Sequence, residues 1–230
     1  MTQFADSRTL IIFDVDGTLV DAHPLDNGCF DRAFQEVAGM ALPEDMWSQF
    51  EELTGQSVIH QALGKAWPDL AGTEMRVKNS FLEKLRRGVE ADGKAIRAYP
   101  GAIEFLYALR KNPVFGVAIA TGCWRETAHF KLTSAGFDFA DIPFACTSDR
   151  YSRAEIITLA AERAGWPVER AIYVGDGLWD LRATRQLGIP FIGVGRRIEA
   201  LRKAGAKHTL EVFEPDAFAR VIQEIRAARN

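Results

Sequence analysis

The sequence has few cysteines, and their arrangement excludes two classes of small protein. The 230 residues contain 3 cysteines, at Cys29, Cys123 and Cys146, without a CxxC pair. An odd number of widely spaced cysteines does not fit a disulfide framework, and without a nearby histidine cluster it does not fit a zinc site. We therefore expect a reduced, intracellular protein.

Long hydrophobic runs and an excess of one charge are also missing. The first 20 residues hold one short apolar run, Leu10–Phe13, which Asp14 interrupts, so a signal peptide and a membrane span are not expected. The 31 acidic and 28 basic residues give a formal net charge of −3, whereas proteins that bind nucleic acid electrostatically usually lean basic. We expect a cytoplasmic protein with neither a nucleic-acid nor a membrane partner.

The remaining composition is that of a globular chain. Hydrophobic residues make up 47% of the sequence, enough for a packed core. Glycine (19) and proline (9) are near their average frequencies, which excludes collagen-like and low-complexity chains.

Short apolar runs alternate with amphipathic stretches over most of the chain. Each run ends in polar or glycine-rich sequence, as expected for strands that are buried on both faces. The amphipathic stretches have helical spacing, and strands that alternate with helices predict βαβ units in a parallel sheet. The predicted strands are Thr9–Phe13, Phe115–Ala120, Ile142–Cys146, Ala171–Val174 and Phe191–Val194.

The interval from about Val20 to Ala98 breaks this alternation, because it contains no convincing strand. Its apolar residues repeat at helical spacing, and Met46–Leu53, Val58–Leu63 and Met75–Leu85 are predicted helices. We therefore predict an α/β fold in which a Rossmann-like parallel-sheet core, residues 1–19 and 97–230, carries an inserted helical cap domain, residues 20–96.

Polar residues follow three of the predicted strands. Asp14 and Asp16 follow the first, Thr121 and Gly122 the second, and Asp176 the fourth. Ligands of open α/β sheets bind at the carboxyl ends of the strands. Three carboxylates gathered there repel one another unless a cation neutralises them, and oxygen ligands favour a hard ion such as Mg²⁺.

The second of these motifs favours an anion. A hydroxyl and free amides at Thr121-Gly122, on a predicted helix N-terminus, suit phosphate. Metal, anion and ionised carboxylate together indicate phosphoryl transfer to an aspartate. Each motif alone is compatible with an ordinary turn or helix cap. All three occur in order, each after its own buried strand, and this favours a functional site.

The sequence Asp14-Val15-Asp16-Gly17-Thr18-Leu19-Val20-Asp21 resembles the first signature of the haloacid dehalogenase-like hydrolase superfamily. Thr121 resembles the second signature, and Gly175-Asp176 through Asp180 resembles the fourth. The helical insertion resembles the C1 cap of phosphoglycolate phosphatase-like members.

This resemblance implies roles for the acidic residues. Asp14 is expected to be the nucleophile that becomes an aspartyl phosphate, and also a metal ligand. Asp16 is expected to protonate the leaving group, then activate water, and to lend its backbone carbonyl to the metal. Asp176 completes the Mg²⁺ site, and Asp180 orients its neighbours.

The resemblance also implies a phosphate-binding set, with one departure from the family pattern. Thr121 and the amide of Gly122 are expected to hold the phosphoryl oxygens. Family members commonly carry a lysine before the helix that follows the third strand, but residues 147–156 contain none. Arg153 is the first candidate to replace it and Arg150 the second, although arginine reaches differently from lysine.

The resemblance implies a Mg²⁺-dependent phosphomonoester hydrolase that acts on a small phosphorylated metabolite. Asp16 favours a phosphatase or a phosphomutase of the β-phosphoglucomutase type over a dehalogenase, and a non-catalytic binding module on the same fold is a further alternative. A Schiff-base role for Lys65, as in phosphonoacetaldehyde hydrolases, competes with an ordinary solvated lysine. The turn Gly55-Gln56-Ser57 is the candidate cap segment that reaches the site.

Overall fold

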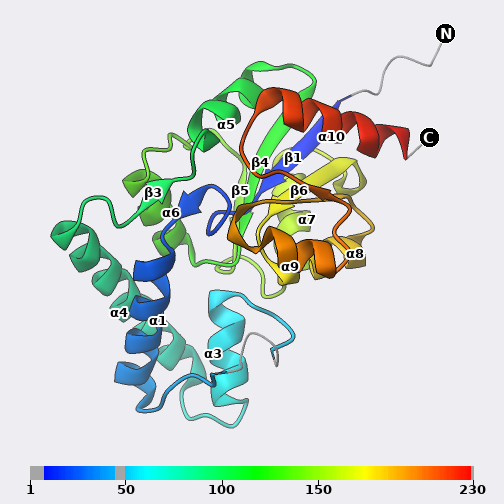
Figure 1. Cartoon of the computed structure of the whole chain (residues 1–230). Helices are drawn as coiled ribbons and strands as arrows, with labels where there is room; N and C mark the ends of the chain where they lie inside the picture. Colours follow the sequence, from blue (N-terminus) through cyan, green and yellow to red (C-terminus); the bar gives the residue numbers. More distant parts are fainter. Residues whose placement is uncertain (1–7, 45–49, 229–230) are drawn as a thin grey trace.

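The computed structural model describes residues 8–44 and 50–228. Its centre is a parallel six-stranded sheet in the order β5-β4-β1-β6-β7-β8 (Figure 1). The chain begins in the middle of the sheet and extends it on both sides, so the predicted Rossmann-like α/β fold is confirmed. The strands are β1 (Thr9–Phe13), β4 (Phe115–Thr121), β5 (Phe144–Cys146), β6 (Ala171–Gly175), β7 (Phe191–Gly193) and β8 (His208–Thr209).

Helices cover both faces of the sheet, which explains why β1 is apolar at each position from Leu10 to Phe13. Ile11 and Phe13 pack against helices of one face, whereas Leu10 and Ile12 pack against helices of the other. The first face carries α5 (Ala102–Lys111), α6 (Arg125–Ser134) and α10 (Pro215–Ala227). The second carries α7 (Arg153–Arg163), α8 (Leu178–Leu187) and α9 (Ile198–Lys203).

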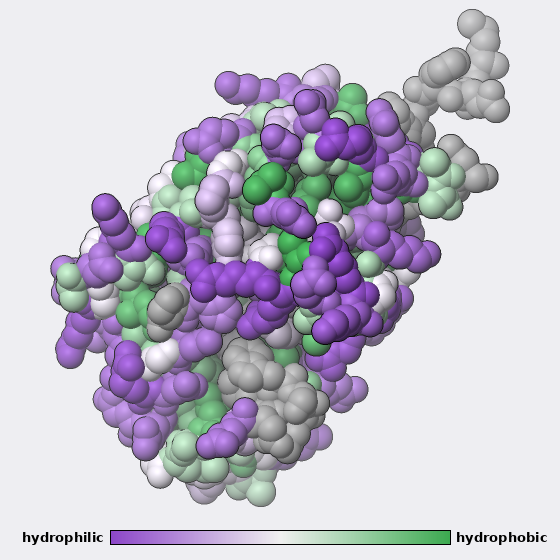
Figure 2. Space-filling model, viewed as in Figure 1, coloured by the Kyte–Doolittle hydropathy of each residue, from purple (hydrophilic) through white to green (hydrophobic). Residues whose placement is uncertain are grey.

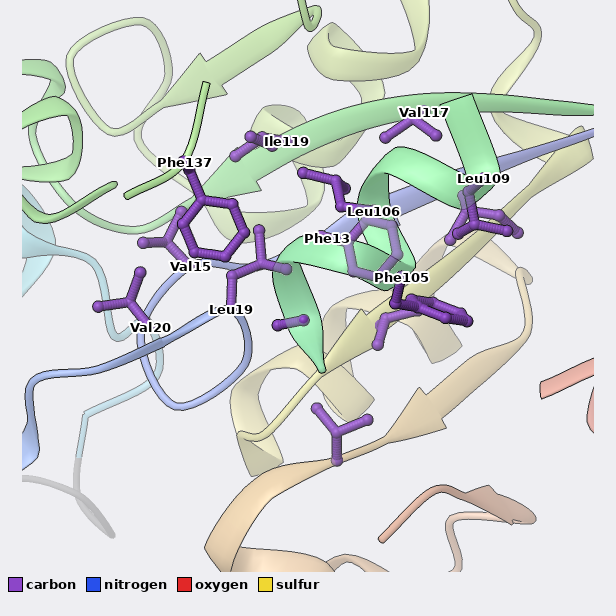
Figure 3. Packing of buried hydrophobic residues seen from close by; sticks show 14 of the residues in the cluster. Phe13, Val15, Leu19, Val20, Phe105, Leu106, Leu109, Val117, Ile119 and Phe137 are labelled. Atoms are coloured by element: carbon purple, nitrogen blue, oxygen red, sulfur yellow. The ribbon is translucent and has the colours of Figure 1, made fainter. Parts of the chain in front are cut away.

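The first face holds a continuous apolar core (Figure 3). The rings of Phe13 and Phe105 lie 6.3 Å apart and nearly perpendicular, at 83°, an arrangement that aromatic quadrupoles favour. Phe105 also packs edge-to-face on Phe218 of α10, with centroids 4.9 Å apart. The sheet and its helices are therefore joined through one aromatic cluster.

Among the described residues, three helices are inserted between β2 (Val20–Asp21) and β3 (Arg97–Ala98) and lie apart from the sheet, at the lower left of Figure 1. These inserted helices are α1 (His23–Ala38), α3 (Gly55–Leu63) and α4 (Leu70–Ala91). The predicted helices Val58–Leu63 and Met75–Leu85 are confirmed and extended by α3 and α4. The three inserted helices share an apolar cluster of their own, which includes Phe34, Ile59 and Leu85. Trp124, from the sheet region, completes this cluster.

Two predictions about the insertion were wrong in detail. Its two ends form an antiparallel strand pair, β2 (Val20–Asp21) with β3 (Arg97–Ala98), and two residues are too few to produce a hydrophobic strand signal. Of the predicted helix Met46–Leu53, residues 46–49 lie outside the described residues, and Phe50–Leu53 is not helical. The amide of Glu51 instead hydrogen-bonds to Gln61 Oε1, at 3.0 Å.

Hydrophilic side chains cover most of the face seen in Figure 2. Within the described part of the chain, no helix is both long enough and apolar enough to cross a membrane.

The variant Phe13→Ala tests the aromatic core. Phe13 is fully buried, so we expect its truncation to lower the free energy of unfolding by about 3–5 kcal/mol. Urea unfolding followed by circular dichroism measures the change. Val212→Ala is the control, because Val212 is 55% exposed and its truncation is expected to cost at most about 0.5 kcal/mol. A loss below about 1 kcal/mol for Phe13→Ala would contradict this account of the core.

Candidate active site

Three adjacent strands bring polar side chains to one edge of the sheet. β1 lies between β4 and β6, so Asp14 after β1 lies between Thr121, the last residue of β4, and Asp176 after β6. These three residues are buried, each with at most 2% exposure. The amide of Asp14 continues the sheet ladder to the carbonyl of Val174, at 2.9 Å. The site is thus built on rigid strand ends.

The turn that follows β1 depends on a glycine. Gly17 has φ +77°, in the left-handed region, and a Cβ at this position would lie 2.2 Å from Asp176 Oδ2. Only glycine accommodates both the backbone conformation and this approach. The glycine of the DxDG motif therefore allows the β1 turn to pack directly on the carboxylate that follows β6.

Arg153 reaches the buried edge from the first position of α7. Its Nη1 lies 3.1 Å from Asp14 Oδ1 and its Nε 3.4 Å from Asp180 Oδ1, and its side chain is 5% exposed. The helix start is fixed by a capping box between Ser152 and Glu155. The other candidate, Arg150, is exposed and donates to the carbonyl of Asp149 at 2.9 Å. Of the two arginines, Arg153 is the one that contacts Asp14.

The loop between β5 and α7, which leads to Arg153, is held by Asp149. Arg163 binds both oxygens of this carboxylate at 2.9 Å, and Arg125 binds both at 2.7 Å. The amide of Cys146 also donates to it, at 3.1 Å. Burial opposes ionisation, but the hydrogen bonds from Arg163 and Cys146 and the charge of Arg125 hold the pKa of Asp149 well below its ordinary value.

Thr121 and Gly122 lie between β4 and α6. The hydroxyl of Thr121 accepts a hydrogen bond from the amide of Cys123 at 3.3 Å. A Cβ on Gly122 would lie 2.7 Å from Arg153 Nη2 and 3.2 Å from the carbonyl oxygen of Leu53. The lack of a side chain at residue 122 therefore allows both the guanidinium and the insertion to approach the end of β4.

Carboxylates are crowded at this edge. Asp14, Asp176 and Asp180 can each offer one oxygen such that all three lie within 4.8 Å of one another. Burial, only partly opposed by Arg153, raises the pKa of Asp14 to about 7 and that of Asp180 to about 6. Burial, partly opposed by Arg197, raises the pKa of Asp176 to about 7. The described side chains thus leave this edge short of positive charge.

The donor set of this cluster fits a hard cation. Oδ1 of Asp176 and Oδ1 of Asp180 are both buried, and neither accepts a hydrogen bond from any described residue. Carboxylate oxygens without nitrogen or sulfur ligands are the set that Mg²⁺ prefers. Asp180, expected only to orient its neighbours, is a member of this cluster, whereas the carboxylate of Asp16 is not.

The carboxylate of Asp16 is bound by two residues that the sequence analysis missed. Lys131 Nζ lies 2.9 and 3.0 Å from its two oxygens, and Cys123 Sγ donates to Oδ2 at 2.6 Å. Lys131 also forms an ion pair with Asp26 of α1. Burial disfavours its charge, but Asp16 and Asp26 outweigh this and raise the pKa of Lys131 well above its ordinary value. A signal was present, because Lys131 occupies the same helical face as the buried Ala128.

Arg197 was also missed, although it follows β7 at the same edge. Its Nη1 lies 2.9 Å from Asp176 Oδ2, and its guanidinium lies 5.0 Å from the centroid of the Trp179 ring. It belongs to Gly193-Val194-Gly195-Arg196-Arg197, a segment with only part of a dinucleotide-binding motif. Arg197 and Asp176 are 21 positions apart in the sequence, so no local pattern predicted their contact.

The carboxylates open into a cavity of about 390 Å³ that the inserted helices also line. Of the candidate segment Gly55–Ser57, Gly55 lines the cavity, and its amide donates to the carbonyl of Gly122 at 2.7 Å. Gln56 instead binds Glu74, at 3.1 Å. Lys65 is exposed and does not line the cavity. The cavity walls include Phe30, Leu53, Thr54, Val58, Trp124 and Trp179.

Comparison with known proteins agrees with this geometry. The sequence profile of the family "Haloacid dehalogenase-like hydrolase" matches residues 11–194. The chain is 31% identical over 192 residues to the phosphoglycolate phosphatase of Agrobacterium fabrum, covering 80% of this chain and 79% of that protein.

Solved structures share the fold. A hydrolase from Pseudomonas syringae superposes with a TM-score of 0.75 at 24% identity and covers 95% of this chain and 99% of that one. A CbbY variant from Rhodobacter sphaeroides, in complex with xylulose-(1,5)bisphosphate, superposes with a TM-score of 0.70 at 21% identity, covering 90% and 95%.

The chain therefore belongs to the haloacid dehalogenase-like hydrolase family, as the resemblance of its signatures predicted. Within that family its curated relatives are phosphoglycolate phosphatases, and it is an enzyme of the phosphatase class.

The variant Asp149→Ala tests the loop that carries Arg153. Removing hydrogen bonds to a charged group is expected to lower the free energy of unfolding by about 1.5–3 kcal/mol at neutral pH. Because the folded-state pKa of Asp149 lies below its ordinary value, this stabilisation is complete above about pH 4 and is lost as the pH falls further. Urea unfolding at pH 7, 5 and 3 measures the difference from wild type. If the difference in free energy of unfolding does not shrink between pH 5 and pH 3, the role of the ionised carboxylate is contradicted. The control is Asp141→Ala, at a side chain that is 91% exposed.

Proposed function

We propose that this protein is a Mg²⁺-dependent phosphomonoester hydrolase that acts on a small phosphorylated metabolite through an aspartyl-phosphate intermediate. The observation that carries the proposal is the position of Asp14, a buried carboxylate with a guanidinium 3.1 Å away and two further carboxylates beside it. A nucleophile that attacks a phosphoryl group needs cations nearby, because nucleophile and substrate are both anionic.

The proposed reaction has two steps. Asp14 attacks phosphorus while Asp16 protonates the departing oxygen, and Asp16 then takes a proton from the water that hydrolyses the aspartyl phosphate. Asp16 lines the cavity, and its side chain is 30% exposed, so it is accessible to a leaving group. Thr121 and Gly122 are proposed to bind the phosphoryl oxygens, and Arg153 to bind Asp14 together with those oxygens.

Mg²⁺ is proposed to bind at Asp14, Asp176 and the backbone carbonyl of Asp16, with Asp180 beside them. The buried Oδ1 of Asp176, which has no hydrogen-bond partner among the described residues, supports this assignment. When bound, the ion would supply positive charge that offsets the repulsion between the nucleophile and the phosphoryl group.

Residues 20–96 are proposed to form a cap domain over a core made of residues 1–19 and 97–230. The β2–β3 pair at the two ends of the insertion is a natural hinge, and Asp21 in it binds both Arg97 and Arg196, at 3.0 and 2.9 Å. A closed cap would exclude water while the leaving group departs.

Cytoplasmic location and the absence of nucleic-acid and membrane partners remain predictions.

The relatives favour a small substrate. Phosphoglycolate is the substrate in the names of the curated relatives, and a sugar bisphosphate is bound in one structural relative. We therefore propose 2-phosphoglycolate as a model substrate, with sugar phosphates and nucleotides as further candidates. A phosphomutase of the β-phosphoglucomutase type is the second candidate, because Asp16 suits it equally, and it would require a bisphosphate activator and release little free phosphate.

The variant Asp14→Asn tests the nucleophile. We expect wild type to release phosphate from at least one member of a panel of phosphorylated metabolites with Mg²⁺, and not with excess EDTA. Asp14→Asn is expected to lose more than about 10³-fold in kcat with the same substrate, because the amide is not a competent nucleophile. Phosphate release measured colorimetrically is the assay, with Asp141→Asn, at an exposed carboxylate, as the matched control.

Two results would contradict the proposal. Unchanged activity of Asp14→Asn would refute the nucleophile assignment. No phosphate release by wild type from any substrate, with or without a bisphosphate activator, would favour the non-catalytic binding module.

The pair Arg153→Ala and Arg150→Ala tests the replacement of the family lysine. Arg153 contacts Asp14 whereas Arg150 is exposed, so we expect Arg153→Ala to lower kcat/KM by about 10²-fold or more and Arg150→Ala by less than about twofold. Steady-state kinetics with the best substrate of the panel measures both. Greater damage from Arg150→Ala would show that the third signature has been misaligned.

A further inference from the structure

Each of the two aspartates proposed to do chemistry has its own buried cation. Arg153 lies against Asp14, and Lys131 of α6 lies against Asp16. The Lys131 side chain has no exposed surface, so it is not a surface lysine that happens to lie near a carboxylate.

Lys131 is bound from the core and from the inserted helices. Its Nζ contacts both oxygens of Asp16, at 2.9 and 3.0 Å, and forms an ion pair with Asp26 of α1. The ring of Phe81, from α4, lies 5.4 Å from the same nitrogen. An ammonium group has three donors, and these contacts direct them to the two carboxylates.

This arrangement determines the orientation of Asp16. Its carboxylate contacts Lys131 through both oxygens and Cys123 through Oδ2, while the side chain remains 30% exposed toward the cavity. A carboxylate held at both oxygens cannot rotate freely, and proton transfer requires a positioned group within hydrogen-bond reach of the leaving oxygen.

We propose that Lys131 is a positioning residue that holds Asp16 in the orientation needed to protonate the leaving group, and that Asp26 links this orientation to the seating of α1. The inference rests on the proposed function, in which Asp16 is the general acid.

If Lys131 positions the general acid, the rate lost on removing Lys131 depends on the leaving group of the substrate. A general acid matters most when the departing alkoxide is a poor leaving group, and little when the leaving group departs without a proton. Loss of Lys131 should therefore slow the hydrolysis of an alkyl phosphate much more than that of 2,4-dinitrophenyl phosphate. Damage to packing alone would slow both substrates by the same factor.

The experiment compares Lys131→Met with wild type on 2-phosphoglycolate, or the best alkyl phosphate of the panel, and on 2,4-dinitrophenyl phosphate. We expect kcat/KM, which reports the steps up to departure of the leaving group and not the later hydrolysis of the aspartyl phosphate, to fall by about 10²-fold for the alkyl phosphate and by less than about fivefold for the dinitrophenyl ester. In an Asp16→Asn background, Lys131→Met should change the dinitrophenyl rate by less than about twofold, because residues that act through one another are not additive.

A matched control removes another lysine that also joins α6 to an inserted helix. Lys78 of α4 pairs with Glu126 of α6 at 2.6 Å, and it does not line the cavity that holds Asp16. Lys78→Met is expected to leave both rates within about twofold of wild type. Circular dichroism and thermal unfolding check that every variant is folded.

A second variant covers the case in which Lys131→Met fails to fold because Asp16 and Asp26 repel each other. Lys131→Met/Asp26→Asn removes one charge of each sign, and it should show the same selective loss with the alkyl phosphate. Asp26→Asn alone keeps the contact between Lys131 and Asp16, and its loss should be selective in the same sense but smaller.

Equal losses with both substrates, a loss no greater than that of Lys78→Met, or additivity with Asp16→Asn would overturn the inference. These outcomes differ from a failure of the proposed function. That function fails if Asp14→Asn retains activity or if Asp16→Asn itself shows no dependence on the leaving group, whereas the inference alone fails if Asp16→Asn shows that dependence and Lys131→Met does not.

Discussion

Negative charge at the carboxyl edge of the sheet is the constraint on which the rest of the site depends. Asp14 and Asp180 are buried there, and ionised carboxylates in such a place are stable only beside positive charge. The chain supplies that charge from separate elements, with Arg153 at the start of α7 and Lys131 in the last turn of α6. The buried Oδ1 of Asp176, without a hydrogen-bond partner among the described residues, indicates where a metal ion would complete the balance.

Close approach of backbone segments is the second constraint. Gly17 brings the β1 turn onto Asp176, and Gly122 leaves room for Arg153. Gly55 packs on the ring of Trp124, where a Cβ would lie 2.8 Å from the nearest ring atom. Because these positions lack side chains, the insertion contacts the end of β4 directly, and the site is formed by the sheet and the inserted helices together.

Much of the fold follows from local patterns. A strand buried on both faces is apolar at nearly every position, so β1, β4 and β6 were visible as short apolar runs, and the polar residues at their carboxyl ends had to share an edge. Strands of two residues, such as Val20–Asp21, carry too few side chains to show a period. The apolar spacing of Phe50–Leu53 predicted a helix that is not there. Spacing alone does not reveal that the backbone of this segment is bound by groups distant in the sequence, such as Arg153.

The sequence by itself determined the fold class, the family and the acidic residues at the strand ends, because each depends on neighbouring residues. The tertiary structure alone decided which cation meets which carboxylate. Nothing local relates Lys131 to Asp16, 115 positions earlier, or Arg197 to Asp176. Only the packing of α6 against the sheet, with Asp26 of α1 at the same ammonium group, brings Lys131 between Asp16 and Asp26. A buried ammonium group is stable only where the fold supplies carboxylates to surround it.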